Sequence, residues 1–241
     1  GQSSNPTAPG ALYLDWTASL GHVFGLSIVS MKQLDIAPLE RLQGFLEQVD
    51  CGDVVIRATL QAYSLRLQGL DKKLSKSLEE DVMASSSPQD LARSPVGPLS
   101  ESGSRKTLVS MILVLNSVYP DYDFTLLRAS NFQRQPGMSV VEEAVDSAMV
   151  EVSKIWSETP GYGEEPFLDA LWRVLDEACS LKDCEVFSYT DNDPFEEPGS
   201  LWVTNYFFVN RKEQQILFFA ATGISKSALE TSQTTLSYAR Y

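Results

Sequence analysis

Hydrophobic and polar positions along this chain repeat with two distinct periods. Residues 36–50, IAPLERLQGFLEQVD, carry apolar side chains at helical spacing, and Pro38 suits a first helical turn. Residues 138–158 and 166–181 repeat this spacing, with one apolar stripe along each segment. The segment RKTLVSMILVLNSVY, residues 105–119, is apolar on nearly all sides. These patterns predict three amphipathic helices and one buried helix.

Other segments alternate with a period of two, which is typical of half-buried strands. From Val54 to Tyr63, the even and odd positions fall on opposite faces, and the even positions are all apolar. The segments CEVFSYT, SLWVTNYFFVN and QQILFFAATG are rich in β-branched and aromatic residues and are separated by turn residues. The short connection VNRKEQQ predicts a hairpin between the last two strands. The whole predicts a single α+β domain, in which an antiparallel sheet of four to five strands packs with helices.

The segment 84–104 interrupts these patterns. Its sequence, ASSSPQDLARSPVGPLSESGS, holds seven serines and three prolines in 21 positions and has few side chains to bury. We predict a disordered, mobile Ser/Pro-rich linker here, inside one domain that spans residues 31–222. Residues 1–30 are expected to be a leader, extension or artefact outside the core fold, and residues 223–241 a C-terminal tail.

The net charge of the chain limits the kinds of molecule that it is expected to bind. The chain has 241 residues, of which 43% are hydrophobic, so it can build the core of a domain of this size. Its net charge is −13, and such a surface repels phosphate backbones. We therefore expect no direct binding of nucleic acid. No apolar run reaches the 18 or so residues of a membrane span, so we expect no membrane contact.

Residues that commonly carry catalysis or bind metals are scarce. His22 is the only histidine, and the three cysteines, Cys51, Cys179 and Cys184, form no CxxC motif. This argues against His-based triads and zinc sites with several imidazoles. An odd, low cysteine count is typical of free thiols in a reducing compartment. We predict no catalytic residues, no metal and no cofactor.

The acid-rich segment DNDPFEEPG, residues 191–199, lies between two aromatic strands. Asp191 and Asp193 are not followed by the glycine and glutamate of a calcium-binding loop, and no phosphate-binding loop occurs in the chain. We interpret the segment as a strand connection that is stiffened by Pro194 and anchored by Phe195.

Seven carboxylates lie between residues 177 and 197, against one lysine. They predict an acidic surface patch that suits a basic protein partner. Two alternatives stay open for this region. One is an acidic metal-dependent hydrolase that uses Asp191, Asp193 and Glu196. The other is an adaptor that presents the peptide DPF to the membrane-traffic machinery.

An ordered set of motifs resembles a known family. After RKTL (105–108), the chain contains PDYDF (120–124), LW-x-x-LDE (171–177), DCEVFSY (183–189), DNDPFEEPGSLW (191–202), NYFFVNRK (205–212) and ILFF (216–219). Together they resemble the Maf-one family, the eukaryotic negative regulators of RNA polymerase III transcription. The segment that starts at Met31 is similar to the beginning of that family, so the resemblance covers about residues 31–222.

The resemblance implies a repressor rather than an enzyme. Members of the family bind RNA polymerase III near its clamp and prevent its recruitment to the promoter-bound factor TFIIIB, so that tRNA and 5S RNA synthesis falls under stress. Nutrient-responsive protein kinases, opposed by phosphatases, control them through the linker. For this chain the resemblance implies a protein of the nucleus and the cytoplasm, which we expect to be a monomer.

Three serines are candidate phosphorylation sites. Ser87 and Ser94 each precede a proline, and Ser75 follows two lysines. The family motifs give a further set of candidate interface residues, which are Arg105, Lys106, Asp121, Tyr122, Asp123, Asp191, Asp193, Pro194, Phe195, Glu196 and Trp202. Within it, Tyr122 and Trp202 are expected to pack against the core, and Arg105 and Lys106 could contribute to a nuclear-import signal.

Overall fold

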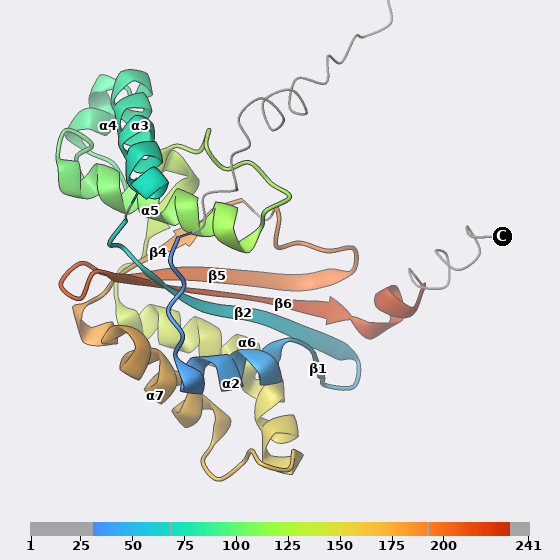
Figure 1. Ribbon diagram of the computed structural model, residues 1–241. Helices are drawn as coiled ribbons and strands as arrows, with labels where there is room; N and C mark the ends of the chain where they lie inside the picture. Colours follow the sequence, from blue (N-terminus) through green and yellow to red (C-terminus); the bar gives the residue numbers. More distant parts are fainter. Residues whose placement is uncertain (1–30, 68, 192, 232–241) are drawn as a thin grey trace, which may run out of the picture.

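A six-stranded antiparallel sheet forms the centre of the computed structural model, which describes residues 31–67, 69–191 and 193–231 (Figure 1). The strand order is β1-β2-β6-β5-β4-β3. The strands are β1 (Val49–Asp50), β2 (Val54–Ser64), β3 (Phe132–Arg134), β4 (Glu185–Tyr189), β5 (Ser200–Asn210) and β6 (Gln215–Ser225). The α+β prediction is confirmed. The sheet has one strand more than the upper expectation, because β1 and β3 are edge strands too short to show a period.

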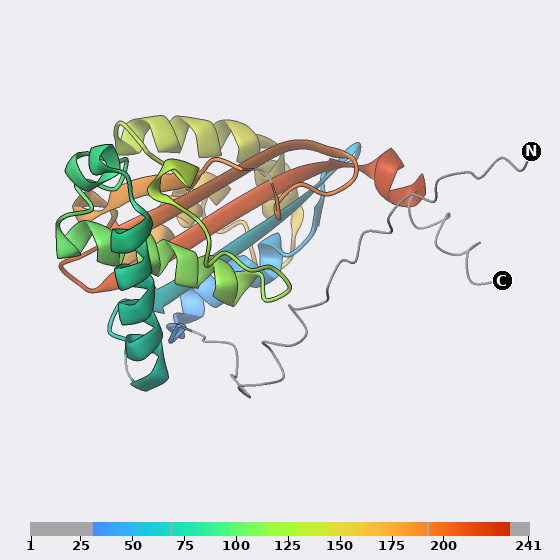
Figure 2. The same ribbon diagram turned by 90° about the horizontal axis from the view of Figure 1, so that it is seen from above.

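Helices cover both faces of the sheet (Figures 1 and 2). They are α2 (Ala37–Leu46), α3 (Gly69–Ser85), α4 (Pro88–Ala92), α5 (Ser102–Val118), α6 (Met138–Glu158) and α7 (Phe167–Cys179), with short 3-10 turns at Ala129–Asn131 and Leu181–Asp183. Residues 226–231 are also helical. The four helices predicted from apolar spacing are confirmed. Among the described helices, none is long and apolar enough to cross a membrane.

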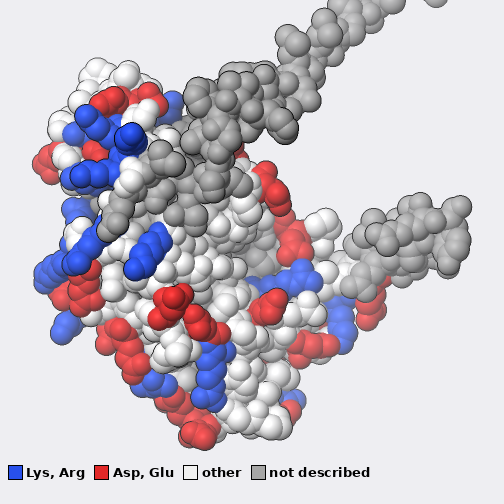
Figure 3. Space-filling model, in the orientation of Figure 1, with Lys and Arg blue, Asp and Glu red and all other residues white. Residues whose placement is uncertain are grey.

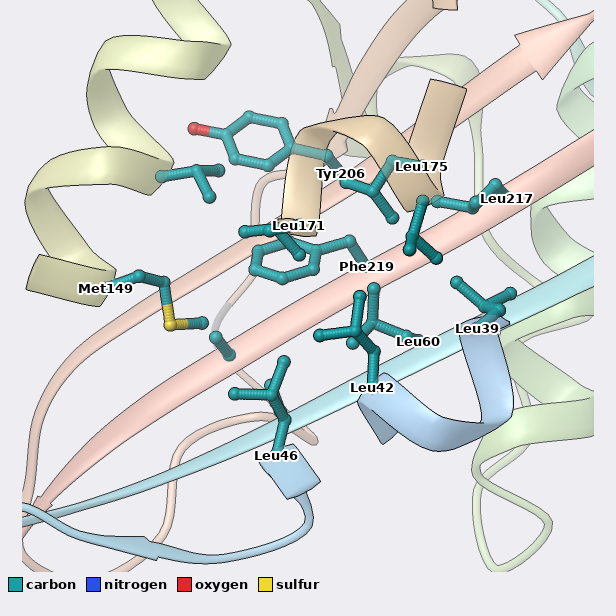
Figure 4. Packing of buried hydrophobic residues seen from close by; sticks show 14 of the residues in the cluster. Leu39, Leu42, Leu46, Leu60, Met149, Leu171, Leu175, Tyr206, Leu217 and Phe219 are labelled. Carbon is teal, nitrogen blue, oxygen red and sulfur yellow. The ribbon is translucent and has the colours of Figure 1, made fainter. Parts of the chain in front are cut away.

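On one face, α2, α6 and α7 pack against β2, β5 and β6 (Figure 4). Each helix contributes an apolar stripe to this core, and Leu42, Val145 and Leu171 are all at most 2% exposed. The sheet contributes alternate residues of each strand, such as Leu60 and Phe219. In α6 the stripe includes Met149 and Trp156 rather than their neighbours Ala148 and Ile155.

On the opposite face, α5 lies between the sheet and the helices α3 and α4 (Figures 1 and 2). Its residues from Thr107 to Leu115 are all buried, which agrees with the prediction of a helix that is apolar all round. Both faces of β6 are therefore covered, so residues Ile216 to Ile224 are buried without interruption. This burial explains why the motif ILFF lacks the alternation of a half-exposed strand.

Residues 84–104 differ from the predicted linker. The segment includes the end of α3 and all of α4, and Val96 and Leu99 are buried against α5. Arg105 holds its end by donating hydrogen bonds to the carbonyl oxygens of Leu99 and Ser100 at 2.7 and 2.9 Å. Two apolar anchors and one guanidinium therefore order a segment whose composition is typical of a linker.

The C-terminal end of the sheet extends beyond the expected domain boundary. Strand β6 runs to Ser225, so the sheet includes three residues assigned to the tail. Helix α3 was not predicted from the sequence, although Leu74, Leu78 and Val82 recur every four residues on its packed side. The predicted extension, residues 1–30, and residues 232–241 of the tail lie outside the described residues.

Candidate functional site

Two of the family motifs meet at one end of the sheet. PDYDF follows the C-terminus of α5, and DNDPFEEPG connects β4 to β5. The Tyr122 hydroxyl interacts with the Asp193 carboxylate, and this interaction raises the pKa of Tyr122. Beneath this contact, the Phe124 ring packs edge-on against Tyr189, with 6.3 Å between centroids. The structure thus joins PDYDF and DNDPFEEPG, which are far apart in the sequence, into one surface that we call the motif surface.

Phe195 anchors the motif surface to the core. Its side chain is 5% exposed, and its ring lies 5.4 Å from Tyr119, edge-on, and 6.3 Å from Phe218. The Thr222 hydroxyl in β6 donates a hydrogen bond to the Phe195 carbonyl oxygen at 3.0 Å. The peptide bond between Asp193 and Pro194 is cis. This confirms the anchor role predicted for Phe195, and such burial is not expected of a DPF peptide presented for docking.

Tyr119 was not singled out from the sequence, yet it lies at the centre of this cluster. Its ring contacts Phe195 and, at 6.4 Å, Phe218. Burial raises its pKa, and a hydrogen bond with Thr59 in β2 opposes this shift in part. The Tyr119 ring therefore packs between α5, β6 and the connection. Only its place directly before PDYDF could have indicated this role.

The outer side of the motif surface is acidic and exposed. Tyr122 is 44% exposed and stacks on Phe124, with 5.9 Å between centroids. Its expected packing as a cap on the core is therefore only partial. Asp123 is exposed but accepts hydrogen bonds from the Thr125 amide and hydroxyl, which fix this turn. The remaining acidic members, Asp121, Asp191, Asp193 and Glu196, are exposed as well.

A hollow of about 230 Å³ borders the motif surface. Pro194, Phe195 and Tyr119 form one side, and residues of α2, β2 and β6 form the other. Across it, the Arg57 guanidinium pairs with the Glu197 carboxylate at 2.8 Å. Both side chains are more than one-third exposed, so the pair positions the connection more than it stabilises the fold.

Basic neighbours compensate much of the predicted acidic patch. Four of the seven carboxylates are paired: Glu177 with Arg173, Asp183 with Lys212, Glu185 with Arg134 and Arg211, and Glu197 with Arg57. The hydrogen bond from Lys212 lowers the pKa of Asp183. Asp191, Asp193 and Glu196 have no basic partner among the described residues. Within this patch, the unpaired carboxylates therefore all lie on the motif surface.

Trp202 supports the sheet next to this connection. It lies opposite Gly223 in the β5–β6 pair, and a Cβ atom added at Gly223 would lie 2.3 Å from the indole. The ring thus covers a strand position that only glycine can occupy. Trp202 is half-buried at the edge of the core, as its motif predicted.

Arg105 and Lys106 lie away from the motif surface, near the N-terminus of α5. Fourteen residues of helix separate Arg105 from Tyr119, or about 21 Å. The Arg105 guanidinium donates hydrogen bonds to carbonyl oxygens near the end of the 84–104 segment, and it lies 4.0 Å from the Glu79 carboxylate. It therefore has a structural role, whereas Lys106 is exposed.

The three candidate phosphorylation sites differ in accessibility. Ser87 is exposed at the N-cap of α4, where its hydroxyl oxygen accepts a hydrogen bond from the Asp90 amide at 3.1 Å. Ser94 is half-buried and donates to the Gly97 carbonyl oxygen at 2.6 Å. Ser75 is only 8% exposed, on the side of α3 that faces α5. Modification of Ser75 would require α3 to move.

The cysteines and acidic residues show no reactive arrangement in the described part of the chain. The three cysteines are free thiols, and the Cys184 thiol donates to the Cys179 sulfur at 3.7 Å. This hydrogen bond, followed by burial, raises the pKa of Cys184. Within residues 31–231, leaving aside 68 and 192, no three His, Cys, Asp or Glu side chains are grouped so that they could hold a metal ion.

The sequence of this chain is similar to those of known proteins. A family model described as Maf1 regulator matches residues 56–220. The chain is 32% identical to the "Repressor of RNA polymerase III transcription maf1" of Schizosaccharomyces pombe, over 81% of this chain and 84% of that protein. It is 30% identical to the "Repressor of RNA polymerase III transcription" of Dictyostelium discoideum, over 81% and 86% of the two chains.

Solved structures agree with this result. A crystal structure of citrus MAF1 superimposes with a TM-score of 0.63 and 35% identity, covering 78% of this chain and all of that chain. A second crystal form of citrus MAF1 gives a TM-score of 0.61 and 34% identity. The matched region, residues 56–220, includes both halves of the motif surface and most of the sheet beneath it.

Proposed function

Because the chain belongs to the Maf1 regulator family, we propose that it represses transcription by RNA polymerase III. The observation that carries this proposal is the family match over residues 56–220, which includes most of the sheet, α5 to α7 and the motif surface. The relatives from fission yeast and Dictyostelium are named as repressors of this polymerase and not as enzymes. The function proposed is therefore binding and not catalysis.

The mode of repression that we propose is contact with the polymerase near its clamp, which prevents its recruitment to TFIIIB at tRNA and 5S RNA genes. The charge distribution supports a protein partner. A chain with a net charge of −13 repels the backbone of DNA or RNA, whereas the uncompensated carboxylates of the motif surface complement a basic protein surface.

Phosphorylation is the control that we propose for this repression, exerted by nutrient-responsive kinases and reversed by phosphatases. Ser87 is the most accessible of the three candidates, and its hydroxyl also donates to the Asp90 carboxylate at 2.7 Å. A phosphate at this position would remove that hydrogen bond and repel Asp90, which weakens the first turn of α4. We further propose that the protein acts as a monomer and moves between nucleus and cytoplasm.

The experiment that tests the repressor function is promoter-dependent transcription of a tRNA gene by purified RNA polymerase III and TFIIIB. An RNA polymerase II reaction serves as the specificity control. Titration with this protein should lower the tRNA transcript selectively, and preassembly of polymerase and TFIIIB on the promoter should relieve the effect. Equal inhibition of both polymerases, or none at micromolar protein, would reject the proposal.

A pair of charge variants tests the motif surface within the same assay. Asp191→Asn, Asp193→Asn and Glu196→Gln together should weaken repression if this surface contacts the polymerase. The matched control removes three exposed carboxylates of α6, by Glu142→Gln, Glu143→Gln and Glu151→Gln. Equal loss in both triple variants would indicate a general effect of charge, and no loss in either would exclude the motif surface as the contact.

A further inference from the structure

A second hollow, of about 470 Å³, lies between α3 and α5 on the side of the molecule away from the motif surface. Its volume falls within the range of small-molecule sites, about 300–1,000 Å³. Helix α3 contributes Lys72, Ser75, Lys76 and Glu79, and α5 contributes Gly103, Lys106, Thr107 and Ser110. Each set follows the spacing i, i+3, i+4, i+7, so one face of each helix is directed into the hollow.

The chemistry of this lining is unusual for a chain with so many acidic residues. The hollow contains three lysines and Arg211, but Glu79 is its only carboxylate among the described residues. Glu79 is already opposed by Arg105 at 4.0 Å. Figure 3 shows Lys and Arg side chains gathered on this part of the surface, around α3 and the β5–β6 hairpin. The hollow is therefore a local concentration of positive charge.

Two of the lysines are available to a ligand. Lys72 and Lys106 form no ion pair with a described residue, whereas Lys76 lies 3.9 Å from Glu80. Arg211 is held in place, because it pairs with Glu185 at 2.9 Å and its Nε donates to the Thr107 hydroxyl at 3.2 Å. An incoming anion would thus meet two free ammonium groups beside a fixed guanidinium.

Buried hydroxyl groups line the interior of the hollow. Ser75 and Ser110 are 8% and 7% exposed, and neither hydroxyl forms a hydrogen bond with a described residue. Among the described residues, only the Gln215 Oε1 atom is both sealed from solvent and without a hydrogen-bond partner, so the Ser75 and Ser110 hydroxyls stay open to the hollow. They lie on facing helices and can donate hydrogen bonds to an oxygen-rich ligand.

The N-terminus of α5 adds a further attraction for anions. The N-cap residue, Glu101, makes no side-chain hydrogen bond to the first turn, and Gly103 of that turn lines the hollow. Helix amides without a cap and the positive end of the helix dipole both favour a negative ligand.

We propose that the hollow between α3 and α5 binds a small molecule that carries more than one phosphate group. Lys72 and Lys106 would pair with the phosphates, and Ser75 and Ser110 would donate hydrogen bonds to them. This inference does not depend on the repressor function, because it rests only on the lining of the hollow. The ligand would also connect α3 to α5 and so stabilise the segment that carries the candidate phosphorylation sites.

The test is titration of the full chain with inorganic pyrophosphate, followed by calorimetry and by amide NMR spectra at constant ionic strength. Saturable binding with shifts at Ser75 and Ser110 is expected. The double variant Lys72→Gln, Lys106→Gln should weaken binding at least about tenfold, since it removes two charged hydrogen-bond donors. Thermal unfolding of each variant would verify that it is folded.

The matched control is Lys73→Gln combined with Lys32→Gln. This variant removes the same charge from two exposed lysines that do not line the hollow. It should bind pyrophosphate within about twofold of the unchanged chain, apart from the effect of net charge. Equal weakening in both double variants would overturn the proposal, as would an unchanged chain that shows no saturable binding at millimolar pyrophosphate.

Discussion

The Tyr122 hydroxyl interacts with the Asp193 carboxylate, and this interaction links the PDYDF turn to the connection between β4 and β5. Both residues are exposed, so the contact is formed at the surface and is open to solvent. It lies above the buried ring of Phe195, which holds the same connection from below. The family motifs thus share one surface whose outer layer is polar and whose inner layer is aromatic.

The first prediction concerns the pKa of Tyr122. The hydrogen bond to Asp193, and then the charge of that carboxylate, raises the pKa above the ordinary 10.0. Asp193→Asn should return the pKa toward 10.0, measured by NMR titration of the chain with labelled tyrosine. Because the folded pKa is raised, the stabilisation from this contact is complete below the unfolded pKa and is lost as the pH rises through the folded pKa.

Asp121→Asn is the matched control for this measurement. Asp121 makes the smallest contribution to the same shift, through its charge alone. The pKa of Tyr122 should therefore change much less in this variant than in Asp193→Asn. Equal changes in the two variants would contradict the hydrogen bond and would indicate a general electrostatic effect of the acidic surface.

The second prediction separates the anchor from the exposed acid beside it. Phe195→Ala removes a buried ring and should lower the free energy of unfolding by about 3–5 kcal/mol. Glu196→Ala, at an exposed position, should change it by no more than about 0.5 kcal/mol. Urea unfolding measures both. If Phe195→Ala were as stable as Glu196→Ala, the ring would not belong to the core, and presentation of the DPF peptide would regain support.

The third prediction concerns Asn205, a buried amide that completes the pairing of β4 with β5. Its side chain accepts from the Tyr189 amide at 2.7 Å and donates to the Tyr189 carbonyl oxygen at 3.0 Å. Asn205→Leu would leave both backbone groups without partners and should cost about 2–4 kcal/mol of stability. Thr204→Val, at the neighbouring half-buried position, should cost less than about 1 kcal/mol in the same unfolding experiment. Similar losses in the two variants would disprove the role of the amide.

The fourth prediction concerns access of kinases to the candidate serines. Folding should protect Ser75 from phosphorylation, because it is 8% exposed between α3 and α5, but should protect exposed Ser87 little. The measurement compares the modification rate of each serine in the folded chain with its rate in a peptide of the same sequence. Ser75 should be modified at least about tenfold more slowly in the folded chain, since reaction requires local opening.

Leu78→Ala provides the internal check on this protection. Leu78 is buried on α3, so its truncation should loosen the helix and raise the rate at Ser75 without changing the rate at Ser87. Rapid modification of Ser75 in the unchanged folded chain would show that α3 opens freely and that its burial does not limit the kinase.

Local periodicity by itself determined most of the secondary structure. The stripes of α2, α6 and α7, the alternation of β2 and the short β5–β6 connection each predict an element that the structure contains. The anchor role of Phe195 could also be inferred, because an aromatic side chain in a connection stiffened by two prolines is expected to pack against the core. These features depend on neighbours within a few residues, which is why the sequence is enough to indicate them.

Only the tertiary structure decided which distant segments supply burial, hydrogen bonds and ion pairs to one another. Composition predicts a mobile linker at 84–104, but burial of Val96 and Leu99 and the hydrogen bonds from Arg105 order it. The sequence places seven carboxylates in one acidic patch, but in the structure four of them form ion pairs, three of these with residues distant along the chain, and Asp191, Asp193 and Glu196 stay unpaired. The facing hydroxyls of Ser75 and Ser110 likewise depend on how α3 packs on α5. Charge and hydrogen-bond partners come from any part of the chain, and their distances are fixed only when the chain is folded.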